Sequence, residues 1–499
     1  MNSTTRTDTI QLVSLYAKQQ KIYPRAVHGW FAAWRWALVV LTQALFYGLA
    51  WLPWNGRQAL LFDLASRRFY IFDLVLYPQD FIYLTGLLVV SAFALFFFTA
   101  VAGRLWCGYA CPQTVYTEIF LGVERLFEGD RNRRLKLDAA PWGFEKLWRK
   151  GGKQLVWIVL ALWTGFTLVG YFTPIRTLAA EAAQLSFGPW EWFWVLFYGA
   201  ATYGNAGHLR EQVCKYMCPY ARFQGAMFDR DTMIIGYDAQ RGDPRGTRAR
   251  SADAKALGLG DCIDCGLCVQ VCPTGIDIRD GLQSDCIGCA ACIDVCNGVM
   301  DKMRRGRAGP PQAASSPSGG GSSEAAAWGP YQRGLIRYAT QNGMAQRWTQ
   351  RQMMARVLRP RVLAYGAVLL AITTALLATL AMRSPFKVDV VRDRASLARI
   401  VADGRIENVY RLQLMNATES AQRYRVHVLG MSGAHIAGIN EVEVGPAQGR
   451  WFAVAVQLPY AAARDAKPGV RPIRFEIDRL AAHGGDARVV EKSTFVIPR

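Results

Sequence analysis

The sequence predicts a multi-domain integral membrane protein: a bundle of about five apolar helices, an inserted cysteine-rich α+β domain and a C-terminal β-sandwich. Three observations predict it. Long apolar stretches recur before residue 210 and again near 370, all twelve Cys lie between Cys107 and Cys296, and a period-two pattern begins near 386. A chain of 499 residues is also long enough for about three domains.

The composition favours a membrane protein over a soluble one. Hydrophobic residues make up 52 % of the chain, which contains 16 Trp and has a formal net charge of +20. Because apolar stretches interrupt the basic residues, we interpret them as Arg and Lys that face an anionic membrane surface. Nucleic-acid binding is the alternative for so basic a chain. No binding module supports it, and we expect no nucleic-acid partner.

Five stretches approach the roughly 20 apolar residues that a bilayer span requires. They cover residues 31–53, 81–102, 154–173, 190–207 and 362–382, and the fourth is the weakest because it is short and contains glycine. Residues 1–30 are polar and lack the layout of a cleaved signal peptide. We therefore expect the first stretch to be an uncleaved span.

The flanking charges predict the orientation of these spans. Arg and Lys gather in residues 1–30, after the second and fourth stretches and before the fifth, whereas the loops 54–80 and 174–189 contain fewer. By the positive-inside rule, the N-terminus and residues 208–360 are cytoplasmic. Five spans then place the C-terminal domain on the other side of the membrane.

The remaining segments differ in composition, and the predicted domains follow from them. Within residues 304–361, the segment 306–329 is rich in Pro, Gly, Ser and Ala and is typical of a linker. From 383 to 499 the patterns YRLQLMN, YRVHVLG, FAVAVQL, IRFEIDRL and STFVIP alternate with turn-forming stretches, which predicts a small β-sandwich. The predicted domains are residues 1–30, 31–210, 211–250, 251–303, 304–361, 362–382 and 383–499.

Eight cysteines in residues 251–303 form two copies of C-x2-C-x2-C-x3-C, in DCIDCGLCVQVCPTG and SDCIGCAACIDVCNG. This spacing is typical of domains with two [4Fe–4S] clusters, in which the fourth Cys of each run ligates the other cluster. Paired zinc knuckles are the alternative, and the doubled register fits them poorly. We predict a ferredoxin-like α+β domain that transfers electrons. The first cluster takes Cys262, Cys265, Cys268 and Cys296, and the second takes Cys286, Cys289, Cys292 and Cys272.

The other four cysteines form two C-x3-C-P motifs, WCGYACP and CKYMCP, which follow the second and fourth apolar stretches. Cys107 and Cys111, like Cys214 and Cys218, could share one face of a helix. Alternatively, a helix restarts at each Pro, so that Cys111 and Cys218 are N-caps whose pKa the helix N-terminus lowers. Both arrangements suit a soft metal. Cu(I), a third iron–sulfur cluster that uses all four sulfurs, and a redox-active dithiol remain open, as does a structural role for buried thiols.

A few other side chains are weaker candidates. His28 and His208, near the same membrane edge, could assist a metal or quinone site, and Met217 is a possible thioether ligand. His427, His435 and His483 lie in the strand-rich domain and are expected to be ordinary surface residues. There is no P-loop, no G-x-G-x-x-G fingerprint and no nucleophile elbow. Electrons are therefore expected to come from another protein or from quinol.

Several long motifs resemble one known family. KIYPRAVHGWF, SRRFYIFDLVLYPQDF, WCGYACPQTV, CKYMCPYARFQGAMFD and GLIRYATQNG, together with the cysteine runs, resemble the cytochrome c oxidase accessory protein family (FixG-like, also called CcoG or RdxA). The resemblance covers nearly the whole chain and implies a polyferredoxin of the bacterial inner membrane. The ferredoxin domain would be cytoplasmic, and the C-terminal immunoglobulin-like domain periplasmic. The linker 306–329 is longer than the family usually has.

The resemblance also implies an activity, namely reduction of Cu(II) to Cu(I) for assembly of cbb3-type cytochrome c oxidase. Its implied partners are oxidase subunits and copper-delivery proteins. Transiently bound copper would meet the catalytic thiols of Cys107, Cys111, Cys214 and Cys218, while the other eight cysteines hold the two clusters. Two alternatives stay open: a polyferredoxin that acts as a quinol dehydrogenase, and a non-enzymatic assembly scaffold. The electron donor stays unknown.

Overall fold

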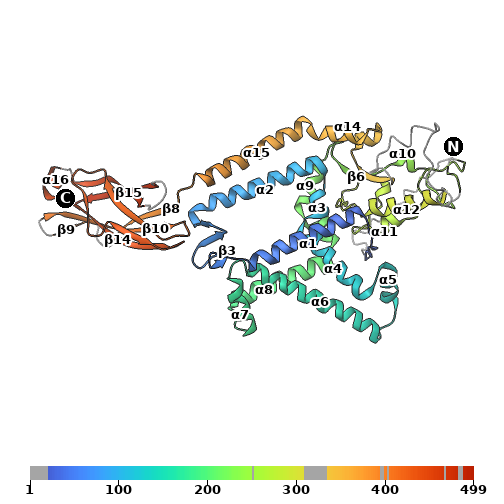
Figure 1. Ribbon diagram of the computed structural model, residues 1–499, viewed down its shortest axis with the longest axis horizontal. Helices are drawn as coiled ribbons and strands as arrows, with labels where there is room; N and C mark the ends of the chain where they lie inside the picture. The colour runs from blue at the N-terminus through green and yellow to red at the C-terminus, as the bar shows by residue number, and fades with distance from the viewer. Residues whose placement is uncertain are drawn as a thin grey trace, which may run out of the picture. The chain divides into compact units, whose positions relative to one another are not determined.

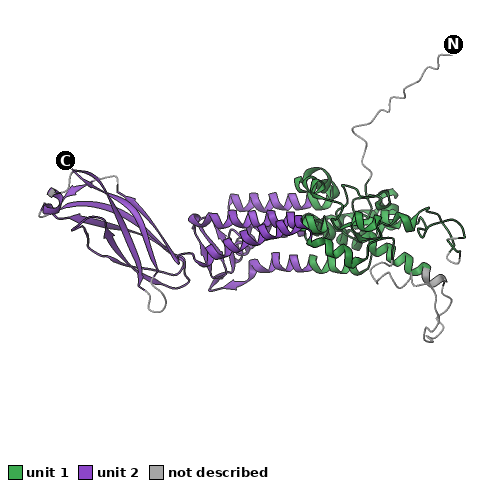
Figure 2. Cartoon of the chain, turned by 90° about the horizontal axis from the view of Figure 1, so that it is seen from above, with its two compact units in different colours: residues 1–39, 98–157, 204–358 green, residues 40–97, 158–203, 359–499 purple. Residues whose placement is uncertain are grey.

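The computed structural model divides the chain into two compact units, which Figure 2 colours separately. Unit 1 comprises residues 1–39, 98–157 and 204–358, and unit 2 comprises residues 40–97, 158–203 and 359–499 (Figure 2). The described residues are 21–249, 252–254, 256–307, 334–393, 398–401, 404–465, 468–480 and 487–498. Most of the predicted N-terminal segment and residues 308–329 of the predicted linker lie outside them.

Each predicted span corresponds to a helix, labelled in Figure 1. These helices are α1 (Trp30–Trp51), α2 (Phe81–Ala102), α6 (Phe144–Val169), α8 (Pro189–Thr202) and α15 (Pro360–Ala381). Among the described residues, three helical stretches are long and apolar enough to cross a membrane, namely Pro78–Ala102, α6 and α15. This is compatible with a membrane protein. The 14 residues of α8 span only about 21 Å, less than a bilayer core, so the count of five spans stays a prediction.

Unit 1 contains the cysteine-rich segments between short helices. Its further elements are α3 (Leu105–Tyr109), α4 (Pro112–Glu128), α5 (Arg131–Ala139), the π-helical η2 (Tyr203–Leu209) and η3 (Val213–Met217), α9 (Pro219–Met227), β6 (Ile234–Tyr237), α10 (Ala239–Gly242), α11 (Leu267–Gln270), η4 (Ile278–Asp280), α12 (Ala291–Arg307), β7 (Ile336–Ala339), α13 (Gln341–Ala345), α14 (Gln350–Ala355) and η6 (Arg356–Leu358).

The core around the eight ferredoxin cysteines extends beyond residues 251–303. Strands β6 and β7 pair antiparallel, although about a hundred residues separate them in sequence, with Ile234 opposite Ala339 and Tyr237 opposite Ile336. Ile235 and Ile336 pack in one buried cluster with Cys268 and other residues of the cysteine-rich segment. The chain therefore returns after the linker to complete the core that holds the cysteine loops.

Buried ion pairs join α4, α5 and α6 within unit 1. Glu124 pairs with Arg134 at 3.0 Å and with Arg210 at 3.1 Å, and Glu128 pairs with Lys153 at 2.7 Å. All five side chains are almost fully buried. Charges buried to this extent require such partners, because an unpaired charge in the interior costs several kcal/mol.

A less buried carboxylate, Asp138 of α5, ties the first described residues of the chain to this region. It accepts hydrogen bonds from Lys21 at 2.9 Å, from Tyr23 at 2.6 Å and from Lys150. Burial raises the pKa of Asp138, but the hydrogen bonds from Lys150, Tyr23 and Lys21 outweigh it and hold the pKa well below its usual range.

Unit 2 contains the predicted β-sandwich, built from two antiparallel sheets. One sheet has the order β12-β14-β10-β8, with β9 also on β10, and the other has the order β13-β11-β15-β16. All five period-two patterns fall in strands, as predicted, and Tyr410, Tyr424, Phe475 and Phe495 are fully buried between the sheets. The elements are β8 (Phe386–Arg392), β9 (Arg399–Ile400), β10 (Ile406–Asn416), β11 (Gln422–Leu429), β12 (His435–Ala437), β13 (Glu441–Val444), β14 (Gly449–Leu458), α16 (Tyr460–Asp465), β15 (Gly469–Leu480) and β16 (Arg488–Ile497).

A second, smaller sheet in unit 2 packs on the base of this sandwich. Tyr70 and Val75 of the small sheet share a buried cluster with Met415 and Ala447 of the sandwich. The loop segments of unit 2 contain β1 (Pro53–Trp54), β2 (Arg57–Gln58), β3 (Leu60–Asp63), β4 (Arg68–Ile71), β5 (Leu74–Leu76), η1 (Pro78–Asp80) and α7 (Ile175–Ala183).

The carboxylate of Asp80 reinforces this junction within unit 2. It is 3 % exposed and pairs with Arg383 at 3.0 Å and Lys387 at 2.6 Å, both at the start of the sandwich. It also accepts the backbone N–H of Tyr77 at 3.1 Å. The loop before α2 and the segment after α15 are thereby fixed to one another.

Candidate iron–sulfur and thiol site

The first C-x3-C-P motif contains a helix break between its two cysteines. Cys107 lies on the short helix α3, and Cys111 is the N-cap residue of α4, with the extended dihedrals φ −62° and ψ 129°. Pro112 takes the first helical position, where its missing N–H costs nothing because that donor has no partner inside a helix. The Thr114 hydroxyl donates to the carbonyl of Cys107 at 2.5 Å and closes the segment into a compact turn.

The second motif repeats this arrangement. Cys214 lies on the π-helical η3, and Cys218 is the N-cap residue of α9, which begins at Pro219. Of the two geometries that the sequence left open, the structure has the helix restart in both motifs. The backbone therefore turns at each Cys-Pro pair, and the two cysteines of a motif do not continue along one helix.

The four thiols lie close enough to influence one another. Burial raises the pKa of Cys107 to about 12, with Cys111 and Cys214 adding to the rise. Burial likewise raises the pKa of Cys214 to about 11, with further contributions from Cys111 and Cys218. Although their motifs are a hundred residues apart in sequence, the four sulfurs form one group.

The prediction that a helix N-terminus lowers the pKa of the N-cap thiol was wrong for Cys111. Burial raises its pKa, and the backbone N–H groups of Gln113 and Thr114 lower it by less. Desolvation of the thiolate outweighs the two N–H donors. A cation at these sulfurs would restore the thiolate, since metal binding displaces the thiol proton.

The eight ferredoxin cysteines line two adjoining cavities. Cys262, Cys265, Cys268 and Cys296 line the first, and Cys272, Cys286, Cys289 and Cys292 line the second, to which Cys268 also contributes. These are the two sets of four that the sequence spacing predicts. Since the fourth Cys of each run belongs to the other run's cavity, the residues present fit a pair of [4Fe–4S] clusters.

A cluster needs four sulfurs spread around a cube, whereas a single ion needs ligands that converge on one point. Among the described residues, no three Cys, His, Asp or Glu side chains converge closely enough to hold one metal ion. The enclosed cavities are therefore the relevant geometry for the eight cysteines.

The second cavity is in direct contact with the first C-x3-C-P motif. A Cβ atom placed on Gly108 would lie 2.6 Å from the carbonyl oxygen of Gly288 and 3.0 Å from Cα of Cys289. Cys107 and Cys214 pack in the same apolar cluster as Cys289. Only glycine allows this approach of the two backbones, which brings the four-thiol group against the loop of the second cavity.

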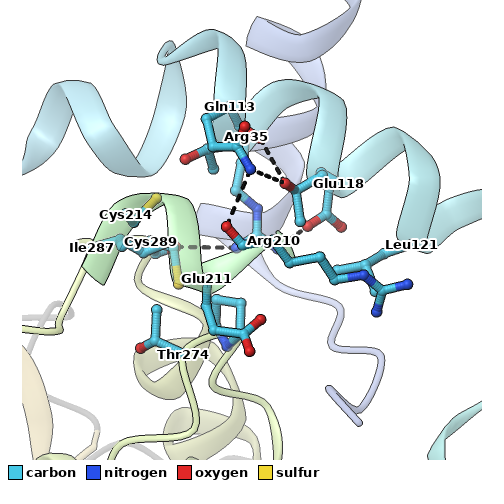
Figure 3. A pocket seen from close by; sticks show the side chains of 13 residues that line it. Arg35, Gln113, Glu118, Leu121, Arg210, Glu211, Cys214, Thr274, Ile287 and Cys289 are labelled. Atoms are coloured by element: carbon cyan, nitrogen blue, oxygen red, sulfur yellow. Dashed lines mark hydrogen bonds and ion pairs between the residues drawn. The ribbon is translucent and has the colours of Figure 1, made fainter. Parts of the chain in front are cut away.

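A small charged pocket lies where these segments meet, shown in Figure 3. Arg35 points toward Glu118, with a 3.7 Å ion pair, and its Nη1 donates to the carbonyl of Cys289 at 3.4 Å (Figure 3). Arg210, Cys214 and other residues complete the lining. A guanidinium held against a cluster-binding loop favours the more negative, reduced state of that loop's cluster.

Comparisons with known proteins are consistent over most of the chain. It is 38 % identical to the nitrogen fixation protein FixG of Rhizobium meliloti over 84 % of this chain and 81 % of that protein. It is 39 % identical to protein RdxB of Cereibacter sphaeroides over 84 % of each chain, and 35 % identical to protein RdxA of the same organism over 96 % of this chain and 98 % of that one. This chain belongs to the FixG family.

Domain models refine this family assignment. Residues 209–308 match a 4Fe-4S dicluster domain, residues 84–134 match a 4Fe-4S binding domain, and residues 376–498 match the Ig-like fold at the C-terminus of FixG. The predicted multi-domain layout and the two-cluster domain are thus supported, and the 4Fe–4S domains indicate redox activity. A crystal structure of a FixG-related protein from Vibrio parahaemolyticus is also similar, at 21 % identity and a TM-score of 0.20, covering 23 % of this chain and 97 % of that one.

In this member of the FixG family, the other predicted candidates are dispersed. Met217 and His208 are exposed on their π-helical segments, and His28 is exposed just before α1. His427 and His435 are exposed on the sandwich, as expected of surface residues, and His483 lies outside the described residues.

Sequence reasoning missed Arg35 and Gly108. The available signal for Arg35 was a charged residue inside an apolar stretch, which is costly there and marks a functional position. For Gly108 it was the difference between the two motifs, since CGYAC has glycine where CKYMC has Lys215.

Proposed function

We propose that this FixG-family chain reduces Cu(II) to Cu(I) at the four C-x3-C-P thiols, using electrons from two [4Fe–4S] clusters. Cys262, Cys265, Cys268 and Cys296 would hold the first cluster, and Cys286, Cys289, Cys292 and Cys272 the second. The single observation that carries the proposal is the contact of Gly108 with Gly288 and Cys289. Through this contact the thiol group adjoins the second cluster's loop.

A bound [4Fe–4S] cluster stores and releases one electron, which is what conversion of one Cu(II) to one Cu(I) requires. The chain's own residues supply the rest. Cys107, Cys111, Cys214 and Cys218 bind copper as soft thiolates, and because thiolates favour Cu(I) over Cu(II), they raise the potential of the bound ion. The Cys-Pro turns fix the two sulfurs of each motif on different segments, so that copper can draw on both motifs.

The cellular role follows as part of the same proposal. Copper reduced here would be supplied to cbb3-type cytochrome c oxidase, with oxidase subunits and copper-delivery proteins as partners. The chain would be a multi-pass protein of the bacterial inner membrane, with the N-terminus and ferredoxin domain cytoplasmic and the Ig-like domain periplasmic. The exposed strands of that domain offer a docking surface.

The test is copper reduction by full-length, cluster-loaded protein that is reduced photochemically without oxygen and then mixed with Cu(II). A Cu(I)-specific chelator measures the product, while visible absorbance follows cluster oxidation. Replacement of all four C-x3-C-P cysteines by Ser should abolish copper-dependent cluster oxidation. Tyr216→Phe, an exposed neighbour in the second motif, is the matched control and should behave as wild type. Unchanged activity in the four-Ser variant would refute the proposal.

A second candidate for the four thiols is a third [4Fe–4S] cluster. The match of residues 84–134 to a 4Fe-4S binding domain favours it, because Cys107 and Cys111 are the only cysteines in that stretch. Iron analysis separates the two candidates. Copper binding predicts about eight iron per chain in wild type and in the four-Ser variant, whereas a third cluster predicts about twelve, with about four lost from the variant.

A further inference from the structure

A large cavity in unit 1 is separate from the cysteine-lined pockets. Its volume is about 700 Å³, within the range of small-molecule sites. The start of α1, the end of α2 and the start of α3 form it together with α12, β7 and α14. Since α2 is one of the helices apolar enough to cross a membrane, the cavity lies where that helix ends.

One wall of this cavity is apolar and open to the surroundings. Trp30 is 64 % exposed, Met354 52 % and Leu105 37 %, and all three line the cavity. Large apolar side chains exposed at the end of a membrane-type helix suit contact with lipid. A ligand with an apolar tail can therefore enter from the bilayer.

The opposite wall is polar, and contacts within the protein hold its side chains in place. Arg337 is 8 % exposed and pairs with Asp238 at 2.9 Å. Asp294 accepts the backbone N–H of Ala32 at 2.8 Å, and the Tyr338 hydroxyl donates to the Gly288 carbonyl at 2.8 Å. These groups present fixed charges and dipoles to a ligand's polar head.

The polar wall is also part of the cluster-binding loops. Asp294 lies between Cys292 and Cys296 on α12, and Asn297 directly follows Cys296. Tyr338 reaches Gly288, and the N–H of Leu335, at the start of the segment that carries Tyr338, donates to Sγ of Cys296 at 3.4 Å. Residues that line this cavity thus adjoin ligand positions of both predicted clusters.

We propose that this cavity binds a lipid-soluble hydroquinone, which supplies the electrons for the clusters. The hydroquinone loses two electrons and two protons and leaves as the quinone, and each of the two clusters accepts one electron. The protons pass to water by way of His28, an exposed imidazole that lines the cavity. This inference rests on the proposed electron-transfer function and names its donor and entry site.

The chemistry of the cavity favours this ligand over others. A metal ion is too small for about 700 Å³, and a nicotinamide or flavin nucleotide would need a phosphate-binding motif that the sequence lacks. A phospholipid shares the apolar tail with the hydroquinone but cannot donate electrons. The experiment therefore has to separate quinone binding from lipid binding.

Gly298 provides a way to fill the cavity. It lines the cavity on α12, and a Cβ placed there meets nothing within 4 Å. Gly298→Leu should therefore occupy ligand space without a backbone clash. Gly225→Leu is the matched control, because Gly225 lies on α9, has equally open surroundings and does not line the cavity.

Full-length protein in phospholipid nanodiscs is tested in two ways. Binding is measured with a photoreactive short-chain quinone, whose labelling sites are mapped by mass spectrometry and competed with unlabelled quinone or excess phospholipid. Cluster reduction by the short-chain quinol is measured without oxygen by paramagnetic resonance. We expect labelling near Trp30 and Met354 that quinone displaces, and affinity about tenfold or more weaker in Gly298→Leu but unchanged in Gly225→Leu.

The outcomes separate this inference from the copper proposal. If quinone does not displace the label, if phospholipid displaces it equally, or if quinol leaves the clusters oxidised, the inference is overturned, even where photochemically reduced protein still reduces Cu(II). If quinol reduces the clusters but copper is not reduced, the hydroquinone site stands and the copper proposal fails. Photochemically driven copper reduction should be the same in Gly298→Leu as in wild type, which checks that the variant is folded.

Discussion

The contact between Gly108 and the second cluster loop can be tested by adding one methyl group. In Gly108→Ala, Cβ would lie 2.6 Å from the Gly288 carbonyl oxygen, while ordinary contact begins near 3.4 Å. The neighbouring atoms are backbone, which cannot rotate away, so the segments have to separate by about 0.8 Å. Overpacking of this kind costs about 1–3 kcal/mol.

Two assays measure the consequence in the full-length protein. The midpoint of thermal unfolding should fall, by about 2–4 °C for each kcal/mol in a unit of 150–250 residues. Copper reduction by photochemically reduced protein should slow, because the four-thiol group moves away from the cluster loop. Gly225→Ala, with open space around its Cβ in α9, is the control and should be neutral or stabilising by about 0.5–1 kcal/mol. If Gly108→Ala matched this control in both assays, the reasoning from backbone contact would be refuted.

Three further changes test other contacts. Asp80→Asn leaves Arg383 and Lys387 without their buried carboxylate, so unit 2 should lose about 3–5 kcal/mol in denaturant unfolding; an unchanged midpoint would contradict the ion pairs. Asp138 has a depressed pKa in the folded state, so its stabilising effect is complete above about pH 4 and declines as the pH falls toward the folded value. Asp138→Asn should flatten that acid dependence of stability, and an identical pH profile would count against it. Tyr338→Phe removes the donor to the Gly288 carbonyl and should cost about 0.5–1.5 kcal/mol, measured by unfolding of cluster-free protein, with no loss expected if water replaces the hydroxyl.

Features that depend on local spacing were predictable from the sequence. The two C-x2-C-x2-C-x3-C runs predicted which four cysteines line each cavity, because short fixed spacings leave a loop few ways to surround a cluster. The period-two patterns predicted the strands of the sandwich, since alternate residues face its core. Pro112 and Pro219 pointed to helix restarts, because proline favours the first position of a helix.

The tertiary structure decided what depends on packing between distant segments. No local pattern encodes the pairing of β6 with β7, the meeting of the two C-x3-C-P motifs, or the close approach of Gly108 to Gly288. The pKa of Cys111 shows the physical reason. A nearby helix N-terminus is visible in the sequence, but the burial that outweighs it depends on residues far along the chain. By itself the sequence determined which cysteines form sets of four, and the folded chain alone decided that the four membrane-edge thiols lie against the second of those sets.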